Sequence, residues 1–374
     1  MVNDINVNKK EKVDLFLAAL NPYTTTNTVD NIEKKVNGKD FIVWGENNKY
    51  PNFLWELYNN CSTLQTIING TTDYVCGNEI VCNVASFQSQ VNKKGETISD
   101  LISKITMDYC TFGSFALQVI RNVNGNIAEL YWVDVTKLRS DEKNEVFWYS
   151  DDWSKSYGRV KTVVYPKFGI NDKNPTSIFY YKGNKTRTTY GTPIWNAATK
   201  NVQIDIAITD FHNSEINNNF MSSKLISFCN GTPSDEQKLE IENNLTEKFG
   251  GSANAARVMI SFSDSKENAP EVISLGSDDL DKRYIELEKR NTNQIFVAFR
   301  AQPILFGLLK ENNGFSQDEF LQAFSLYNRT MVKPIQNIIK NTFDKIFSVD
   351  NSVTITPFSI EVVENTLTNN DVVS

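Results

Sequence analysis

The feature that most constrains this chain is an apolar connection, Phe299–Gly307, placed between two segments with strong helical patterning. It carries Pro303 and Gly307, which favour a turn over a continued helix. Connections are normally polar, because their backbone groups must stay hydrated. This one is expected to pack against something, a neighbouring copy of the chain being one candidate. It therefore favours an assembly protein over an enzyme.

Length and charge narrow the class of protein. A chain of 374 residues is longer than one core usually supports, so two or three structural units are expected. The net charge of -7 argues against non-specific attachment to nucleic acid, although a chain of this charge could enclose DNA without adhering to it. No apolar run approaches the roughly 18 residues that a membrane span needs, so no membrane is expected.

The chain offers little for catalysis. Its single histidine, His212, lies in an Asn-rich helical stretch, where a structural or surface role is expected. No phosphate-binding loop of the type GxxxxGK[ST] is present. We therefore expect no enzyme, no catalytic residue, no metal site and no cofactor. Five cysteines without a CxxC pair, after a polar and charged start, favour free thiols in a reducing cytoplasm: Cys61, Cys76, Cys82, Cys110 and Cys229.

The hydrophobic periodicity predicts an α+β fold. Helices are expected at about 13–20, 52–75, 97–112, 193–222, 234–249, 277–299 and 316–347. Strands are expected at 113–121, 127–135, 146–149, 160–165, 178–181, 257–262, 271–275 and 353–360, with a short strand pair in 79–85. The aromatic residues of 140–190 have strand spacing and are expected in the core rather than as base-stacking platforms. Pro334 lies inside the last helix, where a kink is expected.

One compact unit is distinctly acidic. Between Thr232 and Leu275 the chain has eight acidic and four basic residues. Ser234–Gln237 has the pattern of a capping box that opens a helix. A solvated surface is the default interpretation of such a charge balance, and an electrostatic docking face is the alternative.

Five local patterns occur in the order found in a known family. Together they resemble the portal proteins of tailed double-stranded DNA bacteriophages, in the compact lambda-like, siphovirus-type group, over about residues 50–347. Each pattern alone is weak, and the order of the five is more specific. Arg300 and Gln302 depart from the family pattern, which has Gly and Pro there. The patterns are Tyr109–Arg121 with Gly125–Leu130, Tyr190–Ile194, Thr232–Gln237 with Gly250–Ala256, Phe299–Gly307, and Met331–Pro334.

The resemblance implies a ring, usually of twelve subunits, at one capsid vertex, which serves as the channel for DNA packaging and ejection. It implies a portal-type arrangement of parts along the chain. These are a wing (1–190, with the order of about the first 50 residues left open), a stem helix (191–226), a clip (227–275), a second stem helix (276–299), a tunnel loop (300–316), a kinked wing helix (317–348) and a short crown or tail (349–374).

The resemblance also implies particular residues and partners. The tunnel loop would present Arg300, Gln302, Pro303, Leu305, Phe306, Gly307 and Lys310 to the DNA channel. The clip would dock partners through Asp235, Glu236, Glu240, Glu242 and Glu247. Expected partners are other copies of the chain, the large terminase subunit, the major capsid and scaffolding proteins, a head–tail adaptor, and double-stranded DNA passing without sequence readout. The protein would assemble in the host cytoplasm and reside in the virion.

Two other interpretations remain open at this stage. The chain could be another head–tail structural protein, such as an adaptor or a minor capsid component. An unrecognised enzyme is the alternative from a different class, and the shortage of histidines, metal clusters and nucleotide loops argues against it.

Overall fold

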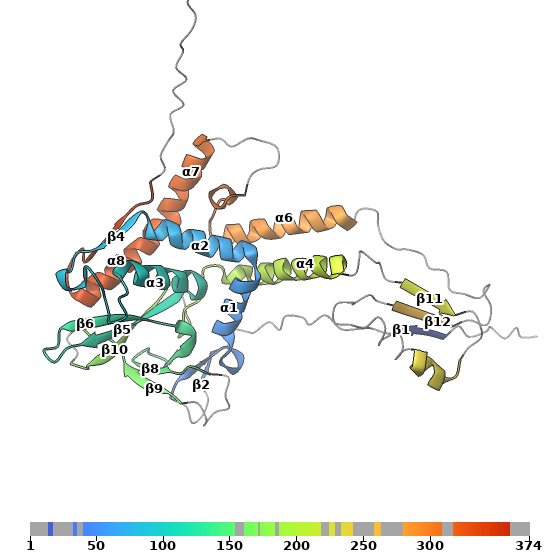
Figure 1. Ribbon diagram of the computed structural model, residues 1–374, viewed down its shortest axis with the longest axis horizontal. Coiled ribbons are helices and arrows are strands. Elements are labelled where there is room, and N and C mark those ends of the chain that lie inside the picture. Colours follow the sequence, from blue (N-terminus) through green and yellow to red (C-terminus); the bar gives the residue numbers. More distant parts are fainter. Residues whose placement is uncertain are drawn as a thin grey trace, which may run out of the picture. The chain divides into compact units, whose positions relative to one another are not determined.

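The computed structural model describes residues 14–17, 33–35, 40–153, 161–170, 173–183, 187–217, 224–228, 233–241, 258–262, 280–308 and 317–359. Helices and strands are mixed along the chain, as the α+β prediction requires (Figure 1). Two compact units form. The smaller comprises Met1–Asn27 and Ile204–Lys289, and the larger comprises Thr28–Gln203 and Arg290–Ser374.

The larger unit begins with two helices where the periodicity predicts one. They are α1 (Tyr50–Asn60) and α2 (Ser62–Cys76). Cys61 separates them, because its backbone is extended at φ -110° and ψ 107°. Its Sγ accepts a hydrogen bond from the Leu64 N–H at 3.4 Å, which caps α2. The hydrophobic periodicity continues through Cys61, so the sequence pattern could not reveal that the helix is broken there.

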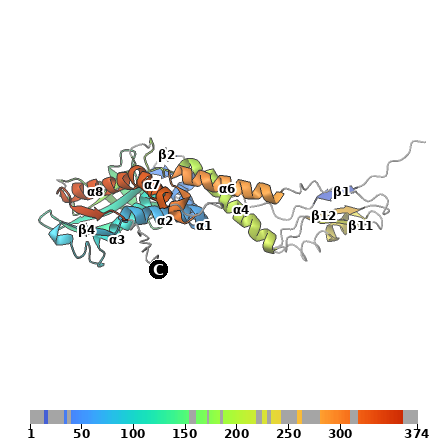
Figure 2. The ribbon, with the colours of Figure 1, turned by 90° about the horizontal axis from the view of Figure 1, so that it is seen from above.

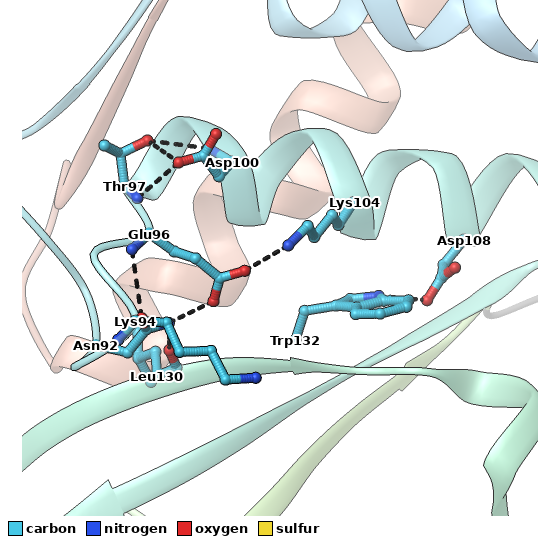
Figure 3. A network of polar contacts seen from close by, with 9 residues as sticks. All are labelled: Asn92, Lys94, Glu96, Thr97, Asp100, Lys104, Asp108, Leu130 and Trp132. Atoms are coloured by element: carbon cyan, nitrogen blue, oxygen red, sulfur yellow. Dashed lines mark hydrogen bonds and ion pairs between the residues drawn. The ribbon is translucent and has the colours of Figure 1, made fainter. Parts of the chain in front are cut away.

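The third helix, α3 (Ile98–Phe112), starts at a capping box formed by Thr97 and Asp100. The Thr97 N–H donates to the Asp100 carboxylate at 2.8 Å, and the Asp100 N–H donates to Thr97 Oγ1 at 3.2 Å. Further along the same helix, Trp132 Nε1 donates to the buried Asp108 carboxylate at 2.8 Å, as Figure 3 shows. This bond joins α3 to the strand that carries Trp132.

That strand belongs to a three-stranded antiparallel sheet of order β10-β5-β6. Its members are β5 (Ser114–Arg121), β6 (Ile127–Val133) and β10 (Thr176–Lys182). A turn at Gly125, with φ +83°, joins β5 to β6. α3 covers the sheet, and α2 and α8 (Lys333–Phe347) lie beside α3 (Figures 1 and 2).

A second antiparallel sheet carries the aromatic runs. It contains β7 (Leu138–Ser140), β8 (Val146–Tyr149) and β9 (Val163–Pro166). The core expected for these aromatics is present: Phe147 is 1% exposed and packs with Ile178 of β10. A small pair, β2 (Glu33–Lys35) with β3 (Ile42–Trp44), is also antiparallel.

The segment between β10 and the next helix packs closely against the end of α3. Two glycines, Gly113 and Gly191, make this close backbone contact possible. A Cβ on Gly113, whose φ is +74°, would lie 2.2 Å from the Thr192 carbonyl oxygen, and a Cβ on Gly191 would lie 2.6 Å from the Ser114 Cβ. Neither position has room for a side chain. Trp195, fully buried, donates from Nε1 to the Cys110 carbonyl at 3.0 Å. The Tyr190–Ile194 pattern thus marks a tight backbone contact.

The strand pair expected within 79–85 is wrong. Only one strand lies there, β4 (Glu79–Cys82), and its antiparallel partner is β13 (Val353–Thr356) from the end of the described chain. The sequence pattern identified both segments as strand-forming. It could not show that they pair across more than 270 residues, because that pairing depends on tertiary structure.

The last long helix is interrupted. α7 (Gln317–Tyr327) leads into a π-helical segment, Asn328–Val332, which leads into α8. Pro334 therefore lies in the first turn of α8, where the missing N–H is tolerated. The expected disturbance by Pro334 takes the form of this π segment, one of the recognised sources of helix distortion.

Two long helices span the boundary between the units in sequence: α4 (Thr199–Asn217) and α6 (Leu280–Ala298). Near their larger-unit ends, Asn291 Nδ2 donates to the Asn201 carbonyl at 2.7 Å, and Asn201 Nδ2 donates to Asn291 Oδ1 at 2.9 Å. The Asn291 side chain is 2% exposed. This reciprocal pair fixes the register of the two helices there.

The smaller unit contains a three-stranded sheet of order β1-β12-β11. β12 (Val258–Phe262) pairs parallel to β11 (Lys224–Phe228) and antiparallel to β1 (Asp14–Leu17). The helix predicted at 13–20 is wrong over its described part, Asp14–Leu17, because these residues form a strand that pairs with β12. The strand predicted at 271–275 lies outside the described residues.

Other sequence expectations bear on the thiols and on membranes. None of the four cysteines within the described ranges forms a disulfide, and burial raises the pKa of Cys110 to about 12. Within those ranges, no helix combines the length and apolar character needed to cross a bilayer.

Candidate functional site

The connection after α6 begins with a specific helix ending. The Ala301 N–H donates to the Phe296 carbonyl at 3.0 Å, and the Arg300 N–H donates to the Val297 carbonyl at 3.0 Å. These are the two bonds of a Schellman ending, and Arg300 takes its left-handed position with φ +53°. Glycine is favoured there, so the backbone follows a glycine-type geometry although the residue is arginine.

A single 3-10 turn, Pro303–Phe306, follows. Proline at its start needs no hydrogen-bond acceptor, because the first N–H groups of such a turn are unpaired. Gly307, with φ +84°, ends the turn, and its N–H and that of Leu308 both donate to the Pro303 carbonyl. The predicted turn is confirmed, and Pro303 and Gly307 form its two ends.

The apolar side chains of this connection pack on their own chain. The Phe306 ring lies 5.8 Å from the Phe296 ring and 5.7 Å from Tyr327, both measured between ring centroids. Leu305 is 7% exposed, and its carbonyl accepts a 2.9 Å hydrogen bond from the Tyr74 hydroxyl of α2. The partner suggested for this apolar stretch, a neighbouring copy, is therefore not needed to explain its burial.

The residues expected to face the channel fall into two groups. Arg300, Gln302 and Gly307 are exposed. Leu305 is buried, while Pro303 and Phe306 are half-buried. The expected loop residue Lys310 lies outside the described residues. The connection therefore offers its polar members and its glycine to the surroundings and turns its largest apolar side chains inward.

The expected docking acids belong to the smaller unit, whereas the connection belongs to the larger one. Residues 235–241 form a helix that opens at the predicted capping box, where the Gln237 N–H donates to Ser234 Oγ at 3.4 Å. Asp235, Glu236 and Glu240 are all exposed on it. The other two expected acids, Glu242 and Glu247, lie outside the described residues.

The sequence interpretation missed the α2 residues that contact the connection. Gly70, Thr71 and Tyr74 lie on neighbouring positions of α2, and Tyr327 of α7 lies against them. One signal for this contact was available. Gly70 is an isolated glycine in the middle of a strongly helical pattern, which usually has a packing reason.

Three solved structures share this fold at low sequence identity. A chain of the neck of a native gene transfer agent particle, computed with C12 symmetry, has a TM-score of 0.53 and 16% identity, covering 82% of this chain and 84% of its own. A chain from the virion of the native gene transfer agent particle has a TM-score of 0.50 and 16% identity, covering 81% and 83%.

The third is an HK97 family phage portal protein from Corynebacterium diphtheriae, with a TM-score of 0.50 and 11% identity, covering 79% of this chain and 90% of its own. No curated protein sequence matches the chain. Identities this low establish a common fold only.

A family model provides the sequence-level link. The model described as "Phage portal protein" matches residues 88–371, which include α3, both long helices, the 3-10 turn and α8. The match covers well over half of the chain and contains all five patterns in full. With this sequence match and the shared fold, the chain belongs to the phage portal protein family.

Proposed function

We propose that this protein forms a closed ring at one vertex of a phage capsid, and that double-stranded DNA enters and leaves through the ring. One observation carries the proposal: the chain shares its fold over most of its length with a chain of a particle neck that was computed with C12 symmetry. A twelve-subunit ring of this chain follows as the simplest assembly, because closed cyclic symmetry reuses a single interface.

Within the ring, the connection Phe299–Gly307 is assigned to the channel wall. Its exposed residues suit a sliding contact, because Gln302 and Gly307 carry no charge and Arg300 alone is cationic. Multiple lysine or arginine contacts to phosphates would hold the DNA and make the contact strongly salt-dependent. A wall with little positive charge lets the duplex pass without sequence readout.

The acidic helix 235–241 is assigned to the docking of partners, first the large terminase subunit and later a head–tail adaptor. Asp235, Glu236 and Glu240 are exposed on this short helix, so a basic partner surface can reach them. Complementary surface charge accelerates association and orients the partner. The helices α4 and α6 are assigned to the stem between this unit and the rest of the chain, and residues 349–374 to a short crown.

Electron microscopy of the purified full-length protein tests the ring directly. Closed rings with an axial hole are expected. A protein that stays monomeric at every concentration and in the presence of scaffolding protein contradicts the proposal. An open or differently sized complex that binds only to preformed capsid vertices would point to a head–tail adaptor instead.

A further inference from the structure

One face of α2, formed by Gly70, Thr71 and Tyr74, receives the 3-10 turn Pro303–Phe306. Gly70 and Tyr74 are four residues apart and therefore share a side of the helix. We call this surface the Gly70 face. Its contacts with the turn differ in kind, one steric and one polar, and each can be removed separately.

The steric contact is made by Gly70. A Cβ at this position would lie 2.8 Å from both Cδ1 and Cε1 of Phe306, which is shorter than van der Waals contact allows. The Phe306 ring thus occupies the space that any larger residue at 70 would fill. Glycine is unfavourable in a helix interior compared with alanine, so its presence here is explained by the ring it admits.

The polar contact is made by Tyr74. Its hydroxyl donates to the Leu305 carbonyl at 2.9 Å, and its ring meets the Phe306 ring edge-on at 6.0 Å. The same ring also contacts Phe324 of α7 at 5.7 Å and Phe358 beyond β13 at 5.5 Å. One tyrosine therefore joins the turn to two other elements.

The Phe306 ring also packs against Tyr327, the last residue of α7 before the π segment. The Thr71 hydroxyl has one proton, which it donates to the Ile67 carbonyl at 2.5 Å. Tyr327 must therefore be the donor in its 2.7 Å bond with Thr71 Oγ1. This bond fixes the Tyr327 ring, which is fully buried, beside Phe306.

We propose that the Gly70 face fixes the position of the channel-wall connection. We call this packing contact, made by Gly70 with Phe306 and by Tyr74 with Leu305, the seat. Gly70 admits the Phe306 ring, and Tyr74 fixes the backbone at Leu305. With both contacts made, the exposed side of the connection, Arg300 and Gln302, is held at a constant distance from α2. The relevance of this seat to DNA passage rests on the proposed function, whereas the seat itself does not.

A pair of variants in the assembled full-length protein tests the steric contact. Gly70→Ala is expected to lower the thermal unfolding midpoint and to raise amide hydrogen exchange at Leu305 and Leu308 by about tenfold, because the added methyl expels Phe306. In a Phe306→Ala background, the same change is expected to raise the midpoint, because alanine favours the helix and the ring is absent. A shift of the same sign in both backgrounds overturns the seat.

The polar contact is tested by Tyr74→Phe, which keeps every ring contact and removes one hydroxyl. Exchange at Leu305 and Leu308 is expected to rise about fivefold, the effect of losing a single net hydrogen bond. Tyr58→Phe is the matched control. It removes the 2.7 Å hydrogen bond from Tyr58 of α1 to Asn69 of α2. Amide exchange at Leu305 and Leu308 should stay unchanged. Equal effects of the two variants contradict the assignment.

The fraction of DNA-filled particles separates the two levels of the proposal. Faster exchange in Gly70→Ala together with fewer filled particles and intact rings supports both the seat and the channel assignment. Faster exchange with normal filling leaves the seat standing and overturns the channel assignment of this connection. Unchanged exchange overturns the seat, whatever the filling.

Discussion

Arg300 shows how one backbone dihedral angle can decide the meaning of a substitution. In the family pattern this position is glycine, and the sequence alone left the consequence open. The structure places Arg300 at φ +53°, at the left-handed position of a Schellman ending. The geometry that glycine would favour is kept, and the arginine adopts it with some strain.

Arg300→Gly is therefore expected to stabilise the protein by about 0.5–1 kcal/mol. It relieves ~1–2 kcal/mol of left-handed strain and loses part of that to the greater freedom of glycine in the unfolded chain. Denaturant unfolding of the assembled protein measures this. Arg300→Ala is the control, since it removes the charge and keeps the strain, and it should not stabilise. If alanine and glycine have the same effect, the charge and not the backbone is responsible.

Asp108 is a buried carboxyl for which the described part of the chain provides no ion-pairing base. Burial holds its pKa well above the usual range, the hydrogen bond from Trp132 lowers it, and nearby Asp134 raises it further. The folded protein therefore binds this proton more tightly than the unfolded chain does. Its effect on stability is most favourable below the unfolded pKa of about 4 and worsens as pH rises toward the folded value.

Asp108→Asn is expected to raise the unfolding midpoint at pH 7 to 8 and to have less effect at pH 4.5. Asp100→Asn is a control of opposite sign, because hydrogen bonds from the Thr97 N–H and hydroxyl lower the Asp100 pKa and ionised Asp100 stabilises the capping box. Its loss should destabilise the protein at pH 7 and matter less as pH falls through the folded pKa. Parallel pH profiles for both variants would contradict this assignment.

At the level of elements, the sequence correctly predicted features that depend on neighbouring residues, but it did not predict the pairing of distant strands. The capping box of α3, the β5–β6 hairpin and both long helices were predictable, because each depends on neighbouring residues. The strand β1 was mistaken for a helix, and the partner of β4 was missed. In each case a distant strand, β12 or β13, determines the conformation of a short apolar run that could form either structure.

The asparagine pair between α4 and α6 is an element-scale feature with a measurable effect. Asn291→Ala removes both hydrogen bonds and leaves Asn201 partly unpaired, so a loss of about 1–3 kcal/mol in unfolding free energy is expected. A double-mutant cycle with Asn201→Ala should show coupling of at least about 0.5 kcal/mol. Additive effects of the two changes would mean that the pair does not act as a unit. Asn60→Ala, at an exposed hydrogen bond within α1, is a control expected to have little effect.

At the level of the whole molecule, charge distribution governs how the proposed channel treats DNA. Gln302→Lys places a new cation at an exposed position of the connection. If the connection lines the channel, phosphate contacts should then reduce DNA filling by about twofold or more, with recovery at higher salt, while rings form normally. Gln302→Met, which is unbranched and close to lysine in length, is the neutral control. A defect in ring formation, with normal filling of the particles that do form, would place the connection at a subunit interface instead.

The acidic helix gives a second whole-molecule prediction. Replacing Asp235, Glu236 and Glu240 with their amides should weaken terminase binding at low salt and flatten its salt dependence, because exposed charges act over about a Debye length of ~10 Å at 0.1 M. Binding isotherms at several salt concentrations measure both. Amide replacement of Glu56, Glu79 and Glu142, exposed acids of the larger unit, is the charge-matched control. A salt-independent affinity in the parent protein would contradict electrostatic docking.

The sequence by itself determined the α+β class, the presence of most helices and of the longer strands, the turn between Pro303 and Gly307, and the family. All of these follow from local propensity, from periodicity or from the order of short patterns. Tertiary structure alone decided what the apolar connection packs against. Gly70, Thr71 and Tyr74 are more than 220 residues away from it in sequence. Their contact depends on how α2 and α7 pack, and no local pattern records the partner of a buried side chain.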